Sequence, residues 1–399
     1  MKEKLKLALI RIIRAFMRVL WVFPLKPQAV FIAFNAGQYS CNPKYISMYL
    51  KKKYGGDINI LWVFNQPEKF GFLKDEGIKL VKNNSFGFFY AMAVSSVVVT
   101  NTGLPSHLVF RKKQIVINTW HGSGAYKKCG IDTDIGSIAI KKLKMAARDT
   151  DWFLSGCRRF SEVMSHSIML PIEKMLETGM PRNDILFSGD KDPAQQKSIQ
   201  WDAARRVRER FSLAEDTHIV IYAPTFRGST AGAENEELSL DIASCLSALG
   251  NRFGGEWAAF YRVHYFLSSS VPTAGSVINV SDYPDMQELL CAADVLITDY
   301  SSCMWDMSLT GKPCFIYATD IEEYRQDRDF YTPVAQWPFP LAQDNAELAE
   351  AISGFDEAKY AKDVKRHHSE LGSFETGEAS AKAGELVYSA IKNKRGDTQ

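Results

Sequence analysis

Beyond residue 27, short apolar runs alternate with amphipathic stretches along the chain. In the first half, six runs rich in β-branched and aromatic residues predict strands, at 29–35, 60–65, 78–81, 96–100, 114–119 and 151–155. Residues 45–53 and 86–94 have the longer period of helices. The second half repeats the pattern, with strands predicted at 218–223, 257–263, 277–280, 295–298 and 314–318 and helices at 241–249 and 286–292. This alternation is typical of βαβ units and parallel sheets.

A polar stretch, residues 188–198 (SGDKDPAQQKS), separates the two halves, and no strand pattern crosses it. A charged helical segment with four arginines follows it, at residues 205–210. Because domain boundaries fall in polar linkers of this kind, we expect one between residues 187 and 200. The predicted fold class is α/β, with two Rossmann-like domains, 28–190 and 200–395, that face each other across a central cleft.

Residues 1–27 are the most basic part of the chain and predict an amphipathic helix. Its cationic face carries Lys4, Arg11, Arg14 and Arg18, and its apolar face carries Leu7, Ile10, Ile13, Met17, Leu20 and Trp21. One interpretation is a helix that packs on the protein's own core. We favour a helix in the interface of an anionic membrane, where each Lys or Arg adds about 1 kcal/mol of binding free energy. Because arginines interrupt the apolar run, neither a membrane-spanning helix nor a signal peptide is expected.

The composition is that of an ordinary globular protein, since 46% of the 399 residues are hydrophobic and 24% are charged. The formal net charge of +2 is too small to indicate a nucleic-acid partner. The cysteines are scattered without a C-x-x-C pair, which is typical of core thiols in a reducing cytosol. They are Cys41, Cys129, Cys157, Cys245, Cys291, Cys303 and Cys314.

Polar motifs follow several of the predicted strands. In open α/β sheets, ligands bind outside the carboxyl ends of the strands, so these positions are the candidate functional sites. The motifs are WHGSGAYKK at 120–128, TGMPRND at 178–184, YAPTFR at 222–227, YRVH at 261–264 and ITDYSSCMWD at 297–306. Each motif alone is more often structural, as a helix cap or a hydrogen-bonded histidine. Their shared position at strand ends favours a functional interpretation.

The first motif combines groups that suit an anionic substrate and a proton transfer. Gly122 and Gly124 let the backbone turn tightly and approach a ligand, and the amides that follow attract anions. Lys127 and Lys128 add positive charge. His121 is the one group of the motif that exchanges a proton near neutral pH.

The last motif predicts a second anion site. Asp299 and either Ser301 or Ser302 are good helix N-caps, and their hydroxyls with the amides of the next turn suit a diphosphate. Arg262 and His264 end a neighbouring predicted strand. Two phosphate-binding sites on two domains predict the transfer of a group between substrates.

The ordered motifs WHG-x-x-x-x-KK-x-G, TG-x-PRND, YAPTFR, R-x-H, TDYSS-x-x-x-D and GKPCFIYATDIEEYRQDRDFY resemble those of the CDP-glycerol glycerophosphotransferase family, which includes teichoic acid and capsule polymerases and primases. The resemblance runs from Asn118 to about Tyr331. It implies a GT-B-like fold and transfer of glycerol phosphate, or a related polyol phosphate, from CDP-glycerol or CDP-ribitol. The implied acceptor is a lipid-linked or polymeric hydroxyl at the cytoplasmic face of the cell membrane.

The resemblance also implies roles for single residues. The catalytic candidates are His121, as general base, and His264. The candidates for donor and phosphate binding are Thr225, Arg227, Arg262, Asp299, Ser301 and Ser302. The candidates on the acceptor side are Gly122, Lys127, Lys128 and Arg182.

No cluster of carboxylates requires a metal ion, although Asp299 or Asp306 could hold Mg²⁺. The family commonly has Thr-Pro after WHG, whereas this chain has Ser123-Gly124, which predicts a more flexible loop.

The residues of these motifs suit the chemistry of this transfer. A hydroxyl attacks phosphorus in line with departing CMP, so the protein needs a base and groups that stabilise charge on the phosphoryl oxygens. General base catalysis typically contributes about 10²- to 10⁴-fold in rate.

Two alternative functions remain open: a sugar transferase that uses a nucleotide sugar and releases a nucleoside diphosphate, and a non-catalytic membrane-bound binding protein. The nucleotide released would distinguish them.

Overall fold

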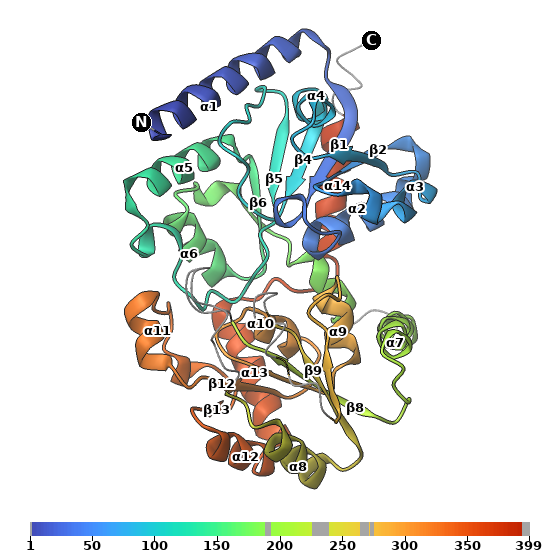
Figure 1. Cartoon of the computed structure of the whole chain (residues 1–399), viewed down its shortest axis with the longest axis vertical. Helices are drawn as coiled ribbons and strands as arrows, with labels where there is room; N and C mark the ends of the chain where they lie inside the picture. The colour runs from blue at the N-terminus through green and yellow to red at the C-terminus, as the bar shows by residue number, and fades with distance from the viewer. Residues whose placement is uncertain (1, 188–192, 226–238, 264–270, 272–274, 393–399) are drawn as a thin grey trace. The chain divides into compact units, whose positions relative to one another are not determined.

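The computed structural model describes residues 2–187, 193–225, 239–263, 271 and 275–392 (Figure 1). The chain forms two compact units. Unit 1 comprises Met1–His121, Cys129–Asp184 and Phe374–Gln399, and unit 2 comprises Gly122–Lys128 and Ile185–Ser373.

Unit 1 is built on a seven-stranded parallel sheet with the strand order β3-β2-β1-β4-β5-β6-β7. The strands are β1 (Lys26–Ile32), β2 (Asn59–Phe64), β3 (Lys79–Lys82), β4 (Ser95–Thr100), β5 (Ile115–Asn118), β6 (Trp152–Ser155) and β7 (Met175–Glu177). All six residues of β4, SSVVVT, are buried, as expected for a central strand with both faces covered.

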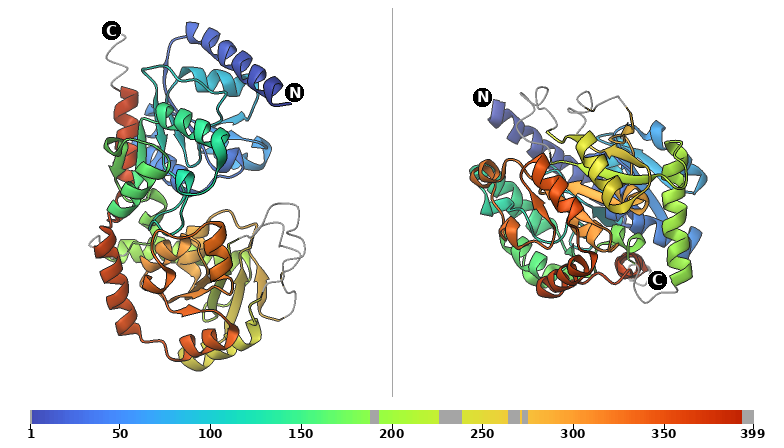
Figure 2. Two further views of the ribbon diagram at one scale, coloured as in Figure 1. Left: turned by 90° about the vertical axis from the view of Figure 1, so that its left-hand side faces the viewer. Right: turned by 90° about the horizontal axis from the view of Figure 1, so that it is seen from below.

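The two faces of this sheet have separate hydrophobic cores. On one face, α2 (Cys41–Tyr54) and α14 (Ala379–Lys392) pack against β1, β2 and β4. On the other, α1 (Lys2–Val19) and α4 (Phe86–Val94) cover the sheet, and both can be followed in Figure 2. The remaining helices of unit 1 are α3 (Phe72–Asp75), α5 (Gly136–Asp149) and α6 (Arg158–Ser167).

Helix α1 corrects the prediction for the first segment. Met17 is fully buried, Leu20 is nearly so, and both belong to the core that contains Phe88 and Met92 of α4. Part of the face predicted to enter a membrane therefore packs on the protein, because its apolar side chains at spacings of three and four residues lie on one side of the helix and share this core. Arg14 is also engaged, since its Nη1 donates to the carbonyl oxygens of Ser106 and Leu108. The side chains of Lys4 and Leu7 lie outside the described part.

Unit 2 contains a six-stranded parallel sheet with the order β10-β9-β8-β11-β12-β13. The strands are β8 (His218–Ala223), β9 (Trp257–Tyr261), β10 (Val277–Asn279), β11 (Val295–Thr298), β12 (Cys314–Tyr317) and β13 (Leu341–Ala342). The helices are α7 (Pro193–Arg210), α8 (Ile242–Phe253), α9 (Met286–Ala292), α10 (Cys303–Ser308), α11 (Ile321–Asp327), α12 (Asn345–Ser353) and α13 (Glu357–Leu371). Aspartates cap several of them: Asp241, Asp285, Asp344 and Asp356 each accept a main-chain N–H of the first turn.

The prediction of an α/β fold with two parallel sheets is confirmed. In both sheets the strand order reverses once, between β1 and β4 in unit 1 and between β8 and β11 in unit 2. Such switch points are where ligands bind in doubly wound folds. Among the described residues, no helix is long and apolar enough to cross a bilayer.

The last helix departs from the expected domain 200–395, because α14 belongs to unit 1. Ala383 and Val387 lie in the same core as α2, and a Cβ on Gly384 would come within 2.3 Å of the Tyr49 ring. Lys53 donates to Glu385 at 2.8 Å. Close packing on α2 therefore brings the end of the chain back to unit 1.

Candidate active site

His121 follows β5, the neighbour of β4, and main-chain contact fixes its ring at the switch point between β1 and β4. Nδ1 lies 2.7 Å from the carbonyl oxygen of Asn101, the residue after β4. Because a carbonyl oxygen only accepts hydrogen bonds, Nδ1 carries the proton and Nε2 is the basic nitrogen. The Asn101 side chain in turn accepts from Phe34 N at 2.8 Å, and the Phe34 ring packs edge-on against His121 at 5.7 Å.

The backbone before His121 is strained, and buried polar groups hold it. Trp120 has a φ of 51°, a conformation that costs of order 1–3 kcal/mol in a non-glycine residue. Nδ2 of Asn42 donates to Trp120 O at 3.0 Å, and Oδ1 of Asn118 accepts from Trp120 N at 2.9 Å. The Trp120 ring stacks on His121 at 4.6 Å. These contacts keep the imidazole in one orientation.

Arg182 supports the same turn. It is 5% exposed, and its Nη1 donates to the carbonyl oxygen of His121. Its main-chain N donates to Oδ1 of Asn42 at 3.0 Å. The guanidinium therefore positions His121, and an additional contact of Arg182 with an acceptor stays a prediction. The sequence pattern did not identify Asn42 or Asn101 as site residues. The position of Asn101 directly after a buried strand could have indicated its role.

The segment Gly122–Lys128 belongs to unit 2 rather than to the unit that contains His121. Its far end pairs with a short stretch before β13: Tyr331 N donates to Tyr126 O at 2.9 Å, and Lys127 forms an antiparallel bridge with Phe330. Gly122 is buried within the segment. Main-chain pairing thus tethers the residues that follow His121 to unit 2.

The expectation of a flexible loop at Ser123-Gly124 is wrong. Ser123 and Ala125 are buried, and Gly124 adopts a φ of 81° in which a Cβ would lie 2.2 Å from the Tyr126 ring. Lys128 forms an ion pair with Asp329, and that hydrogen bond lowers the pKa of the Asp329 carboxyl. Glycine is therefore needed here for a fixed turn, and the charge of Lys128 is already balanced.

Two adjacent histidines of α13, the buried His367 and the partly buried His368, each bond to a hydroxyl of unit 2; we call them the histidine pair. His367 Nε2 lies 3.0 Å from the Tyr126 hydroxyl, and the two rings stack. His368 Nε2 lies 2.7 Å from the Ser308 hydroxyl at the end of α10. Burial is the main cause that lowers the pKa of each imidazole to about 4, so both are neutral at pH 7.

Asp299 lies directly after β11 and shapes the backbone at the switch point of unit 2. It is 2% exposed and accepts hydrogen bonds from Thr225 N and, at 2.6 Å, from the Thr225 hydroxyl. It also accepts from its neighbour Tyr300 N. The Asp299 carboxylate is thus engaged in holding the turns after β8 and β11 together.

The helix caps predicted after Asp299 differ in detail. Ser302 occupies the N-cap position of α10, but its side chain makes no capping hydrogen bond. The Ser301 hydroxyl accepts from Cys303 N at 3.4 Å instead. Ser301 and Ser302 nevertheless stand together at the carboxyl end of β11, as the TDYSS motif predicted.

Of the three other donor-side candidates, only Arg262 lies among the described residues. Nη1 of Arg262 donates to the carbonyl oxygens of Tyr283 at 2.7 Å and Val280 at 3.3 Å, and burial lowers its pKa. Arg262 therefore fixes the loop after β10. Arg227 and His264 lie outside the described residues.

Candidate metal ligands are also engaged. Asp306 is 2% exposed and accepts from Nε2 of Gln287 at 3.0 Å. Over the described ranges, no group of three or more His, Cys, Asp or Glu side chains is arranged to hold a metal ion. Burial raises the pKa of the Cys245 and Cys291 thiols to about 12, as expected for core thiols.

The chain resembles characterised proteins over most of its length. Residues 15–389 match the family model described as CDP-glycerol:poly(glycerophosphate) glycerophosphotransferase. A teichoic acid poly(glycerol phosphate) polymerase of Staphylococcus epidermidis is 29% identical over 92% of this chain, which spans 52% of that relative's length. One of Bacillus spizizenii is 26% identical, with 96% of this chain and 97% of the relative covered.

A solved structure of a wall teichoic acid polymerase, TagF, soaked with CDPG superimposes with a TM-score of 0.82 at 27% identity. The match covers 96% of this chain and 94% of that one. It supports a GT-B-like arrangement of elements. With its family match, its two parallel sheets and its motifs at the switch points, the chain belongs to the CDP-glycerol:poly(glycerophosphate) glycerophosphotransferase family.

Proposed function

We propose that the protein transfers glycerol phosphate from CDP-glycerol to a hydroxyl acceptor, with release of CMP, in the synthesis of a teichoic-acid-like polymer. The observation that carries this proposal is His121, held at a switch point with Nδ1 bonded to a main-chain carbonyl and Nε2 as its basic nitrogen. Family membership supports the donor class. Glycerol is preferred to ribitol because both named relatives are glycerol phosphate polymerases.

In the proposed reaction, the acceptor hydroxyl gives its proton to Nε2 of His121 as its oxygen attacks the phosphorus next to glycerol. The P–O bond to CMP breaks in line with this attack. Asn101 and Arg182 position the base through the ring Nδ1 and the His121 carbonyl, respectively. Their effect on rate therefore comes from orientation.

We propose that the turns fixed by Asp299 bind the donor. Ser301, Ser302 and Thr225 supply hydroxyls and main-chain N–H groups suited to phosphate oxygens. Asp299 acts through the backbone, since Thr225 N and Tyr300 N both donate to it. Arg262 holds the adjacent loop. Contacts of Arg227 and His264 with the donor remain part of the proposal.

We propose the cytoplasmic face of an anionic membrane as the location. The face of α1 available for this is not the one predicted. An outer stripe, opposite Met17, is 40–79% exposed. It consists of Leu9, Ile12, Phe16, Val19 and Val22. Arg11 and Arg18 lie beside it and are exposed. Apolar side chains flanked by arginines suit a headgroup interface.

Helix α5 lies near this stripe, since its Lys142 and Leu9 of α1 line the same cavity. Ile138 is 53% exposed, and Lys141, Lys142 and Lys144 are exposed on the same helix. Ile12→Glu with Val19→Glu should abolish sedimentation with anionic vesicles without lowering the melting temperature. Ile172→Glu is the matched control, because Ile172 is an exposed isoleucine of unit 1 outside α1. Equal sedimentation of the double variant and the control would exclude the outer stripe as the membrane-binding face.

The function is tested by incubating the purified protein with CDP-glycerol or CDP-ribitol and an acceptor extract. We expect acceptor-dependent CMP release, faster with CDP-glycerol. Release of a nucleoside diphosphate from a nucleotide sugar, with no CMP from either donor, would favour the sugar transferase instead.

A further inference from the structure

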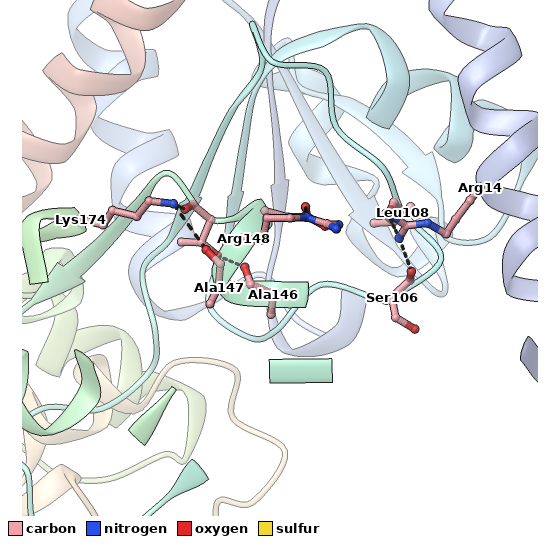
Figure 3. Close-up of polar contacts among 9 residues, drawn as sticks. Arg14, Ser106, Leu108, Ala146, Ala147, Arg148 and Lys174 are labelled. Atoms are coloured by element: carbon pink, nitrogen blue, oxygen red, sulfur yellow. Dashed lines mark hydrogen bonds and ion pairs between the residues drawn. The ribbon is translucent and has the colours of Figure 1, made fainter. Parts of the chain in front are cut away.

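Unit 1 contains a cavity of about 380 Å³ that none of the motifs explains. It lies between α1, the chain from Thr100 to Phe110, and α5. Its volume is within the range of small-molecule binding sites, about 300–1,000 Å³. Figure 3 shows this region, with Arg14 of α1 and Arg148 of α5 extending toward one another from opposite sides.

The cavity is largely apolar, with contributions from four separate parts of unit 1. The apolar side chains come from Ile10 and Ile13 of α1, Leu104 and Phe110 of the connection before β5, and Val116 and Met145. Such a lining suits a hydrocarbon chain, because burial of each CH₂ group is worth about 0.8 kcal/mol. A sugar or a free nucleotide would leave most of this surface unmatched.

Cationic groups lie around the same cavity. Lys142 lines it, and Arg148 lies on the same helix. The only acidic residue in the lining described for the cavity is Asp149, which pairs with Arg148 at 2.8 Å. His107 also lines it, and its buried Nε2 has no hydrogen-bond partner among the described residues. An anionic group with acceptor oxygens would complement these donors.

The position of the cavity connects two features of the proposed function. At one end it is lined by Leu9, which belongs to the outer stripe proposed to meet the membrane. At the other it is lined by Thr100 and Asn118, the last residues of β4 and β5. Asn118 precedes His121 by three residues and bonds to the turn that carries it. A ligand that fills the cavity would therefore extend from the membrane side toward the base.

We propose that this cavity binds the lipid part of the acceptor: a hydrocarbon chain in the apolar lining, with the phosphate that links it to the head beside Lys142. This inference rests on the proposed function, since it assigns a binding site to the acceptor of that reaction. The lipid holds the acceptor hydroxyl near His121, which raises its effective concentration there. Donor binding is independent of the cavity, because the candidate donor turns belong to unit 2.

The test compares two acceptors with the same head group, one on a long isoprenoid phosphate chain in vesicles and one on a short water-soluble chain. Lys142→Glu reverses a charge at the cavity, and Lys141→Glu makes the same change at a neighbouring exposed residue that does not line it. We expect Lys142→Glu to raise KM for the long-chain acceptor at least about tenfold, equivalent to 1.4 kcal/mol, and Lys141→Glu by less than about twofold. KM for the short acceptor should change little in both.

A second pair changes the volume of the cavity rather than its charge. Ala146→Phe places a ring in the lining, whereas Ala139→Phe adds the same ring elsewhere on α5. Only the first should raise KM for the long-chain acceptor, with unchanged KM for CDP-glycerol and unchanged sedimentation with vesicles. Equal effects of both variants, or equal effects on both acceptors, would overturn the assignment.

Binding can also be measured without turnover. A photoreactive farnesyl diphosphate should crosslink to residues 100–110 or 136–149 of the full-length wild-type protein, and Lys142→Glu should weaken the crosslink. Crosslinks confined to other segments would overturn the lipid site. Absence of CMP release with both acceptors would contradict the proposed function instead, so the two failures are distinguishable.

Discussion

The two switch points have the same place in the fold but use their polar groups in opposite ways. In unit 1, the main-chain carbonyl of Asn101 accepts a hydrogen bond from Nδ1 of His121, which makes Nε2 the basic nitrogen of the ring. In unit 2, a side chain holds the main chain, because Asp299 accepts from the N–H groups of Thr225 and Tyr300. A polar residue at a strand end can therefore act on a substrate itself, or it can shape the backbone that binds the substrate. The groups that satisfy its hydrogen bonds indicate which role it has.

The largest expected effect is on catalysis at the first switch point. His121→Ala should lower kcat at least about a hundredfold with little change in KM for CDP-glycerol, because it removes a base that acts in the transition state. His166→Ala is the control, since His166 is an exposed histidine of unit 1 that pairs with Asp132. Steady-state kinetics would measure both. Near wild-type turnover of His121→Ala would mean that both switch points carry structural residues.

The second expected effect concerns stability at the other switch point. Asp299→Ala should lower the free energy of unfolding by about 2–4 kcal/mol, since hydrogen bonds to a buried charged group contribute about 1.5–3 kcal/mol each. The Ser301→Ala, Ser302→Ala double variant should instead weaken CMP binding with little loss of stability. Denaturant unfolding and calorimetry separate the two quantities. Unchanged stability of Asp299→Ala would remove the contrast between the units.

Acid should destabilise unit 2 through the histidine pair. Burial holds the pKa of His367 and His368 near 4, below the ordinary value of 6.5, so the folded state binds fewer protons than the unfolded chain between these values. Their contribution to stability is complete above pH 6.5 and is lost as the pH falls toward 4, by up to about 3 kcal/mol per histidine. Unfolding free energies from pH 7.5 to 4.5 would show this slope. The slope should decrease in His368→Gln, and an unchanged slope in that variant would contradict this prediction.

A smaller effect is expected where the segment after His121 is tethered to unit 2. Tyr126→Phe keeps the ring that stacks on His367 but removes the hydroxyl bonded to it, which should cost about 1 kcal/mol of stability. We expect kcat to fall several-fold while KM for CDP-glycerol stays constant, because the tether orients the loop. In a double-mutant cycle with His367→Gln, the two changes should be non-additive. Additive losses would show that the hydrogen bond does not couple the two residues.

The sequence predicted the strands because β-branched runs bounded by polar residues leave few alternatives. The helix Phe86–Val94 and the strand Val295–Thr298 have the predicted bounds. The short strands β7 and β13 were missed, since three and two residues carry no readable period. The place of α14 in unit 1 was also missed, because it depends on packing against α2, far away in the sequence.

Only part of the candidate site could be predicted from the sequence. Motifs after strands identified His121, Asp299 and Arg182, because strand ends in parallel sheets are where polar side chains gather. Their roles required the structure: Asn101 contributes a main-chain carbonyl, and no side-chain pattern indicates that. Helix α1 shows the same limit, since its apolar residues occur on more than one side and only burial shows that Met17 faces the core and Ile12 faces outward.

The most direct test of the account is the pH dependence of a single turnover on a soluble acceptor. With CDP-glycerol bound and limiting acceptor, the wild-type rate of CMP formation should rise with pH through one ionisation, that of the base. His121→Gln, which keeps a hydrogen-bonding side chain but has no basic nitrogen, should be slower and lack that rise. The same pH dependence in both proteins would contradict the assignment of His121 as the base.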